Sequence, residues 1–339
     1  MVRASTGRTE WVDYAKAIGI ILVVYGHVAR GLQHAGITIN EALFSVIDSV
    51  IYSFHMPLFF FLSGLFFIHS LNNRGPMGTI GNKLETVFYP YVVWSLLQGV
   101  VEVAMAHYTN GDVTLREVSS VLWHPRAQFW FLYALFMIMV IASFIYYRVN
   151  AVWIGVLAFV FLLVYASSNQ LPHEANLELI YQNFFFFAAG ILFNTWRSSF
   201  MQERPFLIMS GLAFVVGQWL FHGYYHMNYE QKGLPLAALA IVSILFVAAL
   251  AHELTRYRLK TLHAIGYASL AIYLMHVLIG SGVRVILQKL LHVEDYTVHL
   301  VIGCLAGIAL PTMLFFYMEK RGMDFLFRLP RKRKLRAAA

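Results

Sequence analysis

The chain has 339 residues, of which 59% are hydrophobic and only 12% are charged, and its mean hydropathy is +0.64. Soluble domains average about 25% charged residues, so this chain has too few to cover a water-exposed surface. The composition argues against a soluble enzyme, a disordered chain and a nucleic-acid-binding domain, although the net charge is +8. The one cysteine, Cys304, excludes an internal disulfide and a cysteine-based zinc site. We predict a single polytopic membrane domain over residues 1–339, with no metal site.

Ten apolar segments follow one another along the chain, and about 20 apolar residues are enough to span a bilayer. The predicted fold class is therefore all-α, with about ten transmembrane helices. The second segment is long enough to tilt or to kink at Pro57. The segments lie near residues 15–33, 43–69, 85–107, 128–147, 151–168, 178–196, 205–222, 234–252, 265–288 and 298–318.

Basic residues concentrate in alternate connecting segments and in the tail at about 319–339. Cytoplasmic segments of membrane proteins carry an excess of Lys and Arg, so this distribution predicts that both termini are cytoplasmic. The first segment follows Arg3 and Arg8, but no small-residue cleavage site comes after it, and we expect it to be retained. The tail, expected to lie beside anionic lipid, contains Arg328, Arg331, Lys332, Arg333, Lys334 and Arg336.

Two groups of residues in the apolar segments are expected to serve packing. Gly26, Gly64, Gly190 and Gly266 favour close contact between helices over phosphate binding. The run Phe184–Phe187 is expected either to face lipid or to add bulk to the core.

Three histidines stand out in the apolar segments, because ionisable groups in a bilayer are costly and usually line a cavity. They are His27 in the first segment, His55 in the second and His276 in the ninth. At about 1.5 Å of rise per residue, each lies near the middle of the membrane. Three histidines at one depth indicate a buried reaction chamber. The alternative for each is a hydrogen bond between helices.

The first segment carries a polar stripe. Lys16 and His27 are eleven residues apart, which is 20° beyond three full turns, and Asp13 lies within about 40° of the same face. The stripe would place a cation at the membrane boundary and an imidazole in the interior. Alternatively, Asp13 caps the helix and Lys16 extends to lipid phosphate.

Two other segments show related spacings. Asp48 and His55 are seven residues apart and are expected to share a face, so that the carboxylate orients the imidazole or, alternatively, caps the helix towards a loop. In the ninth segment Ser269, Tyr273 and His276 form a polar stripe at helical spacing.

Several motifs resemble those of the membrane-bound acyltransferase family 3. Trp11–His27 resembles the first span of that family, whose members commonly have a basic residue, usually Arg, eleven positions before a histidine. Here that residue is Lys16. Phe54–Gly64, with the sequence Phe-His-Met-Pro-Leu-Phe-Phe-Phe-Leu-Ser-Gly, resembles the next span of the subgroup described as fucose 4-O-acetylase-like. Further similarities recur in order at Asn82–Tyr91, Trp130–Tyr133, Ser269–His276 and Tyr317–Lys320.

The resemblance implies an enzyme that moves an acyl group, often acetyl from acetyl-CoA, to a sugar hydroxyl of a polysaccharide, a lipid-linked glycan or an antibiotic. The donor would dock from the cytoplasm with its phosphates near Lys16, Lys83 and Arg74. The family is often richer in Arg in the second cytoplasmic stretch than this chain is. We expect no permanently bound cofactor, and a multi-pass protein of the bacterial inner membrane.

The hypothesis assigns His27 as the general base, with a transient acetyl-imidazole as the alternative route. His55, His276 or Tyr273 would stabilise the oxyanion or bind the sugar, and Asp13, on the same stripe as His27, is also expected to be a catalytic residue. For the acceptor we expect contacts with Trp130, Tyr133 and Asp48. The two aromatic rings would stack on the sugar or, alternatively, belong to the aromatic belt at the membrane interface.

A transporter or flippase is the competing class, in which mid-membrane histidines relay protons or bind substrate. It explains the composition but not the ordered motifs. A lipid or peptidoglycan acyltransferase would share the donor and differ in the acceptor. The expected partners are acyl-CoA, a carbohydrate acceptor and the lipid bilayer. The sequence does not indicate an oligomeric state.

Overall fold

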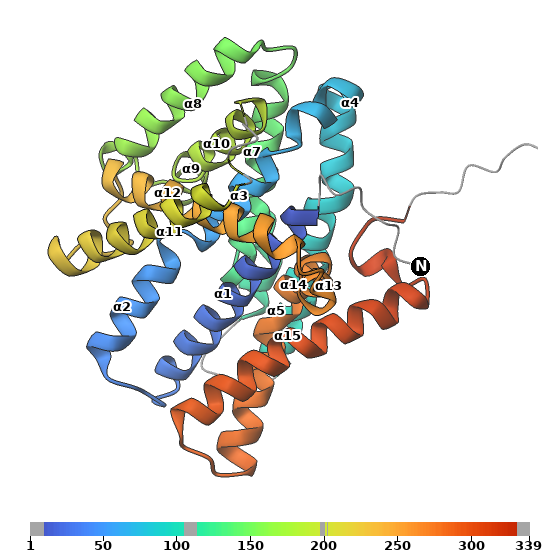
Figure 1. Cartoon of the computed structure of the whole chain (residues 1–339). Coiled ribbons are helices and arrows are strands. Elements are labelled where there is room, and N and C mark those ends of the chain that lie inside the picture. Colours follow the sequence, from blue (N-terminus) through green and yellow to red (C-terminus); the bar gives the residue numbers. More distant parts are fainter. Residues whose placement is uncertain (1–9, 105–113, 197–200, 202, 331–339) are drawn as a thin grey trace, which may run out of the picture.

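The computed structural model describes residues 10–104, 114–196, 201 and 203–330, and no strand occurs among them (Figure 1). The all-α class is confirmed. The α-helices are α1 (Glu10–His34), α2 (Glu41–Tyr52), α3 (His55–Gly64), α4 (Phe67–Lys83), α5 (Tyr89–Ala104), α6 (Leu115–Ser119), α7 (Trp130–Ile145), α8 (Ala151–Ala166), α9 (Ala175–Tyr181), α10 (Phe184–Trp196), α11 (Arg204–Gln218), α12 (Leu234–Thr255), α13 (Lys260–Tyr267), α14 (Ser269–Val285) and α15 (Tyr296–Lys320).

Nine helical stretches of the described chain are long and apolar enough to span a membrane. The one other predicted segment, 151–168, corresponds to α8, an apolar helix of 16 residues. The predicted count of about ten therefore agrees with the structure. Arg3, Arg8 and the tail residues from Arg331 onward lie outside the described part, and the cytoplasmic placement of the termini stays a prediction.

The second predicted segment is interrupted, but not at Pro57. Helix α2 ends at Tyr52 and α3 begins at His55, so the break falls at Ser53 and Phe54. Pro57 is the third residue of α3. In the first turn of a helix the N–H groups make no hydrogen bond within the helix, so a proline is tolerated there. The prediction of a kink at Pro57 was therefore wrong by one turn.

Residues 70–84, expected to connect two spans, are helical instead. Helix α4 continues through a π-helical turn at Leu84–Phe88 into α5, and together they form one stretch from Phe67 to Ala104. The direction changes at Gly75, whose φ of 68° is readily adopted only by glycine, and Pro76 starts the next helical section.

Helix α1 is the central element and packs against α3, α12, α13, α14 and α15 (Figure 1). Buried residues occur along the whole length of α1, and those that are almost completely buried include Trp11, Ile20 and Val23. Because α1 is enclosed by neighbouring helices, the polar groups on it face protein and cavities more than lipid.

Glycines allow three close helix contacts. A Cβ at Gly64 of α3 would lie 2.1 Å from the carbonyl oxygen of Phe187, and a Cβ at Gly190 of α10 would lie 2.0 Å from that of Phe61. A Cβ at Gly266 would lie 1.8 Å from the carbonyl oxygen of Asp13. These distances confirm that the glycines serve helix packing. Gly26 does so too, since a Cβ there would lie 2.9 Å from the Tyr52 ring.

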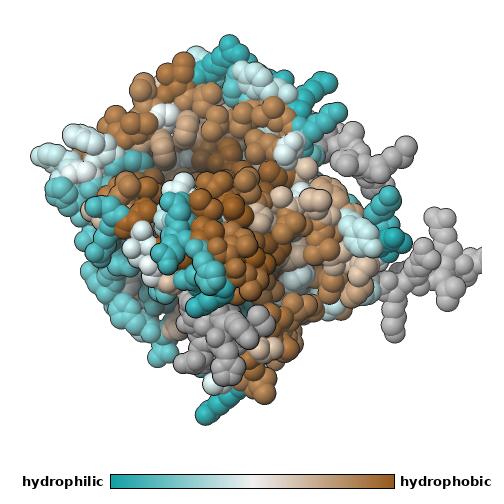
Figure 2. Space-filling model, turned by 90° about the horizontal axis from the view of Figure 1, so that it is seen from below, coloured by the Kyte–Doolittle hydropathy of each residue, from teal (hydrophilic) through white to brown (hydrophobic). Residues whose placement is uncertain are grey.

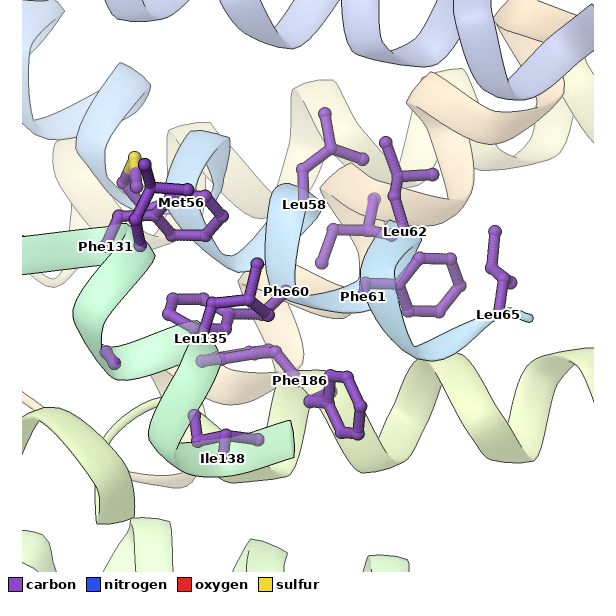
Figure 3. Packing of buried hydrophobic residues seen from close by; sticks show 14 of the residues in the cluster. Met56, Leu58, Phe60, Phe61, Leu62, Leu65, Phe131, Leu135, Ile138 and Phe186 are labelled. Carbon is purple, nitrogen blue, oxygen red and sulfur yellow. The ribbon is translucent and has the colours of Figure 1, made fainter. Parts of the chain in front are cut away.

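Helix α3 lies in the middle of the core, where Phe60 packs edge to face on Phe131 of α7, on the side of α3 that faces Phe186 of α10 (Figure 3). All residues of the run Phe184–Phe187 are buried, so this run belongs to the core and does not face lipid. Large apolar side chains are also exposed on the outside, and Figure 2 shows them covering much of one face, with hydrophilic residues gathered mainly at its margins.

Candidate active site

His27 and His276 are in direct contact. Nε2 of His276 lies 3.1 Å from Nδ1 of His27, and the two ring centroids are 4.9 Å apart with the rings edge to face. His27 is on α1 and His276 on α14, two helices that pack along each other. The predicted convergence of these two histidines is confirmed, whereas their chemical role stays a prediction.

Backbone carbonyls determine the tautomer of each ring. Nδ1 of His276 lies 2.8 Å from the carbonyl oxygen of Tyr273 and 3.0 Å from that of Ile272, so Nδ1 carries the hydrogen and Nε2 has a lone pair. Nδ1 of His27 lies 3.0 Å from the carbonyl oxygen of Val23 and faces this lone pair, so it is also the protonated nitrogen. Nε2 of His27 therefore keeps its lone pair, as a general base requires.

Both histidines line a small cavity of about 120 Å³, which we call the His27 cavity. It lies beside the C-terminal half of α1 and also contacts Ser281, Arg284 and His299. Gly31, one turn after His27, belongs to the same wall.

A second cavity, the Lys16 cavity, lies beside the N-terminal half of α1 and has a volume of about 550 Å³. Lys16, Lys83 and Asp13 line it, together with Tyr273. Nζ of Lys16 lies 3.3 Å from a carboxylate oxygen of Asp13, whose other oxygen lies 3.5 Å from Nε2 of His263. The cavity therefore combines two ammonium groups with one carboxylate. This supports neither a pure helix cap for Asp13 nor a lipid-facing Lys16.

Tyr273 lies between the Lys16 cavity and His276. It lines the Lys16 cavity, and its ring centroid lies 6.2 Å from that of His276, one turn further along α14. Its hydroxyl donates a hydrogen bond to the carbonyl oxygen of Gln128, so it is held in place by the start of α7. Phe131 packs edge to face on Tyr273 and lines the same cavity. The aromatic pair therefore separates the Lys16 cavity from the imidazoles.

A third cavity, of about 310 Å³, contains the predicted sugar-binding residue Trp130, and we call it the Trp130 cavity. Tyr52 and Tyr229 add aromatic surface, and Asn183 adds an amide. Lys232 also lines it, and burial lowers the pKa of its ammonium group. Aromatic rings with a few hydrogen-bonding groups are typical of cavities that bind small molecules.

Asp48 does not act on His55. Both of its oxygens accept hydrogen bonds from Arg30, each at 2.7 Å. The guanidinium of Arg30 also lies 3.3 Å from the ring centroid of Tyr52. The break between α2 and α3 ends the helical spacing that was expected to put Asp48 and His55 on one face, and that prediction was wrong. None of the three cavities includes Asp48 in its wall.

The remaining predicted residues are more dispersed. His55 is fully buried at the start of α3, donates from Nδ1 to the carbonyl oxygen of Ile51, and forms no hydrogen bond with the histidine pair among the described residues. Tyr133 is buried against Tyr91 and lines none of the three cavities. Arg74 is exposed on α4 and does not line the Lys16 cavity.

Sequence reasoning missed several residues around these sites. Arg30 entered none of the site hypotheses, yet it lies in α1 and holds Asp48. Arg284 and His299 entered no hypothesis, although both are buried polar residues in apolar helices. That combination was the signal that could have found them, because such residues usually line cavities.

Comparison with known families bears on what this arrangement does. A family model described as an acyltransferase domain matches residues 9–316, which is most of the chain and includes every residue of the three cavities. The chain belongs to this acyltransferase family. The family expected from the sequence motifs is thus confirmed, and acyltransferase is the enzyme class that the family defines. Its helices make it an integral membrane member.

One relative is nodulation protein NolL of Sinorhizobium fredii, which is 31% identical over 134 residues. The match covers 39% of this chain and 34% of the relative, so it spans about a third of the relative's length. No solved structure matches the chain.

Proposed function

We propose that this protein moves an acetyl group from acetyl-CoA to a hydroxyl of a sugar, in an exopolysaccharide or a lipid-linked glycan, with His27 as the general base. The observation that carries the proposal is the contact of His27 with His276 in the wall of the His27 cavity, with the Lys16 cavity and its ammonium groups beside the other half of the same helix. Membership of the acyltransferase family supports the reaction class. We further propose the bacterial inner membrane as the location, with both termini in the cytoplasm.

The Lys16 cavity is the proposed donor site. Acetyl-CoA is strongly anionic, and Lys16 and Lys83 supply ammonium groups for its phosphates as point charges. The apolar wall of the cavity suits the pantetheine arm, which would extend along α1 towards Tyr273. Eleven residues of helix separate Lys16 from His27, a rise of roughly 16 Å. The pantetheine arm is long and flexible enough to cross that distance once the Tyr273 ring moves aside.

The chemistry then needs one base and one polarised carbonyl. Nε2 of His27 takes the proton of the acceptor hydroxyl while the oxygen attacks the thioester carbon. The carbon–sulfur bond breaks, the CoA thiolate takes up the proton that His27 removed, and the products are a sugar acetyl ester, free CoA and neutral His27. His276 accepts the hydrogen on Nδ1 of His27 and stabilises the imidazolium that forms.

The decisive experiment uses the purified protein in lipid nanodiscs with acetyl-CoA labelled in the acetyl group. We expect CoA release that depends on an added sugar acceptor, and label in the sugar product. The His34→Ala variant is the matched control for His27→Ala, because His34 is exposed at the end of the same helix. If the protein binds sugars but releases no CoA with any acceptor, the proposal fails and a transporter or flippase becomes the better interpretation.

A further inference from the structure

The wall of the Trp130 cavity contains hydrogen-bond donors that other described residues do not use. Tyr165 of α8 lines the cavity and is only 2% exposed, yet its hydroxyl makes no hydrogen bond among the described residues. The same is true of the indole N–H of Trp130. Polar groups withdrawn from water are costly without a partner, so donors of this kind in a cavity wall indicate a ligand that accepts from them.

Two amide oxygens in the same wall are acceptors. Gln182 donates from Nε2 to a carboxylate oxygen of Glu178 at 2.6 Å, and Asn183 donates from Nδ2 to the carbonyl oxygen of Leu179 at 2.8 Å. These bonds orient each amide, and its oxygen accepts no hydrogen bond from another described residue. A hydroxyl group both donates and accepts, whereas an ionised carboxylate only accepts. The mixture of donors and acceptors therefore favours a ligand rich in hydroxyl groups.

Lys232 adds donors to the cavity without making its surroundings strongly cationic. Its Nζ lies 3.0 Å from the carbonyl oxygen of Tyr229, which uses one of the three N–H groups of the ammonium. Glu178 and Glu230 act on the pKa of Lys232 in the opposite direction to burial, so both carboxylates lie near it. Neither of them lines the cavity. Because this negative charge lies close behind the wall, a neutral ligand fits better than an anion.

Arg30 holds the aromatic part of the wall in place. Its guanidinium lies over the ring of Tyr52 and donates a hydrogen bond to the hydroxyl of Tyr229 at 2.9 Å. The backbone N–H of Tyr229 donates to Oγ of Ser49, also at 2.9 Å. Tyr52 packs against α1 at Gly26, the residue before His27. The two rings thus form a preorganised surface, which lowers the entropic cost of binding a ligand against them.

We propose that the Trp130 cavity binds a neutral sugar ring of the acceptor. Its hydroxyls bond to Tyr165, to Lys232 and to the amide oxygens, while the ring lies against Tyr52 and Tyr229. That this sugar is the acceptor rests on the proposed function. That the cavity binds a neutral sugar rests on its wall alone, and it is measured separately as binding without an acyl donor.

The test is isothermal titration calorimetry on the protein in nanodiscs, with glucose, galactose, mannose and glucuronate as ligands. We expect at least one of the three neutral hexoses to bind about fivefold or more tightly than glucuronate, because a buried carboxylate cannot donate to the amide oxygens and would lie near Glu178 and Glu230. No binding of any hexose overturns the assignment of the cavity. Glucuronate that binds as tightly as the best hexose overturns the preference for a neutral sugar.

Two variants locate the binding of that hexose. Tyr165→Phe removes one hydroxyl and is expected to weaken binding about three- to tenfold, the contribution of one hydrogen bond. Tyr146→Phe is the matched control, because Tyr146 is also fully buried, its hydroxyl also has no partner among the described residues, and it lies outside the cavity. Unchanged binding in Tyr165→Phe, or an equal loss in Tyr146→Phe, contradicts the proposed site.

The second variant is Lys232→Met, which keeps the length of the side chain and removes its donors. We expect it to weaken hexose binding to a similar extent, about three- to tenfold. Lys289→Met is its control, because Lys289 is exposed after α14 and does not line the cavity. Hexose binding that is the same in Lys232→Met and Lys289→Met would place the sugar elsewhere.

The two proposals fail in distinguishable ways. Hexose binding that depends on Tyr165 and Lys232, without CoA release for any acceptor, supports the sugar site and contradicts the proposed function. Acyl transfer to a sugar at normal efficiency in both Tyr165→Phe and Lys232→Met leaves the proposed function intact and overturns the Trp130 cavity as the acceptor site.

Discussion

Nε2 of His276 accepts the hydrogen that Nδ1 of His27 carries, across 3.1 Å, while backbone carbonyls one turn earlier hold both rings in orientation. The contact joins α1 to α14 and leaves the lone pair on Nε2 of His27 available. His27 lines the His27 cavity. An imidazole fixed by a second hydrogen-bonding group is better oriented and more basic than a free one. His276 is therefore a positioning residue for His27.

We predict that His276→Gln lowers kcat by about ten- to a hundredfold, the usual effect of removing the group that orients an imidazole. The apparent KM for acetyl-CoA is expected to stay unchanged, because His276 does not line the Lys16 cavity. Steady-state kinetics on the purified protein check this. A variant with normal kcat, or one in which only the KM for the donor rises, would show that the contact between the two imidazoles does not assist the base.

His27→Ala is predicted to reduce acyl transfer by about 10²- to 10⁴-fold, the contribution typical of a general base. Acetyl-CoA binding is expected to remain, since His27 lies outside the Lys16 cavity. Transfer of labelled acetyl is measured beside donor binding, with His34→Ala as the control. Near-normal transfer in His27→Ala would remove this histidine from the mechanism.

Part of this site follows from the sequence because it depends on helical periodicity alone. Lys16 and His27 lie on one helix, so their spacing determines both their common face and their separation. The contact between His27 and His276 could also be predicted from the sequence, because depth in the membrane limits which residues of two helices can meet. Depth alone does not say which of three histidines pair, and His55 forms no hydrogen bond with the other two among the described residues.

The rest depends on how helices rotate and break, which packing decides. Asp48 pairs with Arg30 instead of lying on the face of His55, because α2 stops at Tyr52 and the chain turns before α3. The left-handed φ at Gly75 likewise lets a segment expected as a loop continue as helix. Neither a helix break without proline nor a glycine bend inside a helix has a distinct signature in a single sequence.

Lys16→Ala is predicted to raise the apparent KM for acetyl-CoA by about tenfold, with a smaller change in kcat, because one ammonium–phosphate contact contributes about 1.4 kcal/mol. The increase should shrink at high salt, since screening weakens the same contact in the wild type. Kinetics at two ionic strengths check both points. Lys260→Ala is the control, because Lys260 is exposed at the start of α13 and does not line the Lys16 cavity. An unchanged dependence on donor concentration in Lys16→Ala would contradict the phosphate role.

Gly64→Ala is predicted to destabilise the protein by about 3 kcal/mol, because the new methyl group would lie 2.1 Å from a backbone oxygen of α10. Backbone cannot rotate away as a side chain can, so α3 and α10 would have to separate and loosen the core around Phe61 and Phe187. Thermal unfolding in detergent, followed by circular dichroism, measures the effect. Gly155→Ala is the matched control, since a Cβ there meets no atom within 4 Å, and a helical Gly→Ala change without a clash stabilises by up to about 1 kcal/mol. If both variants unfold at the same temperature as the wild type, α3 and α10 do not depend on the close contact at Gly64.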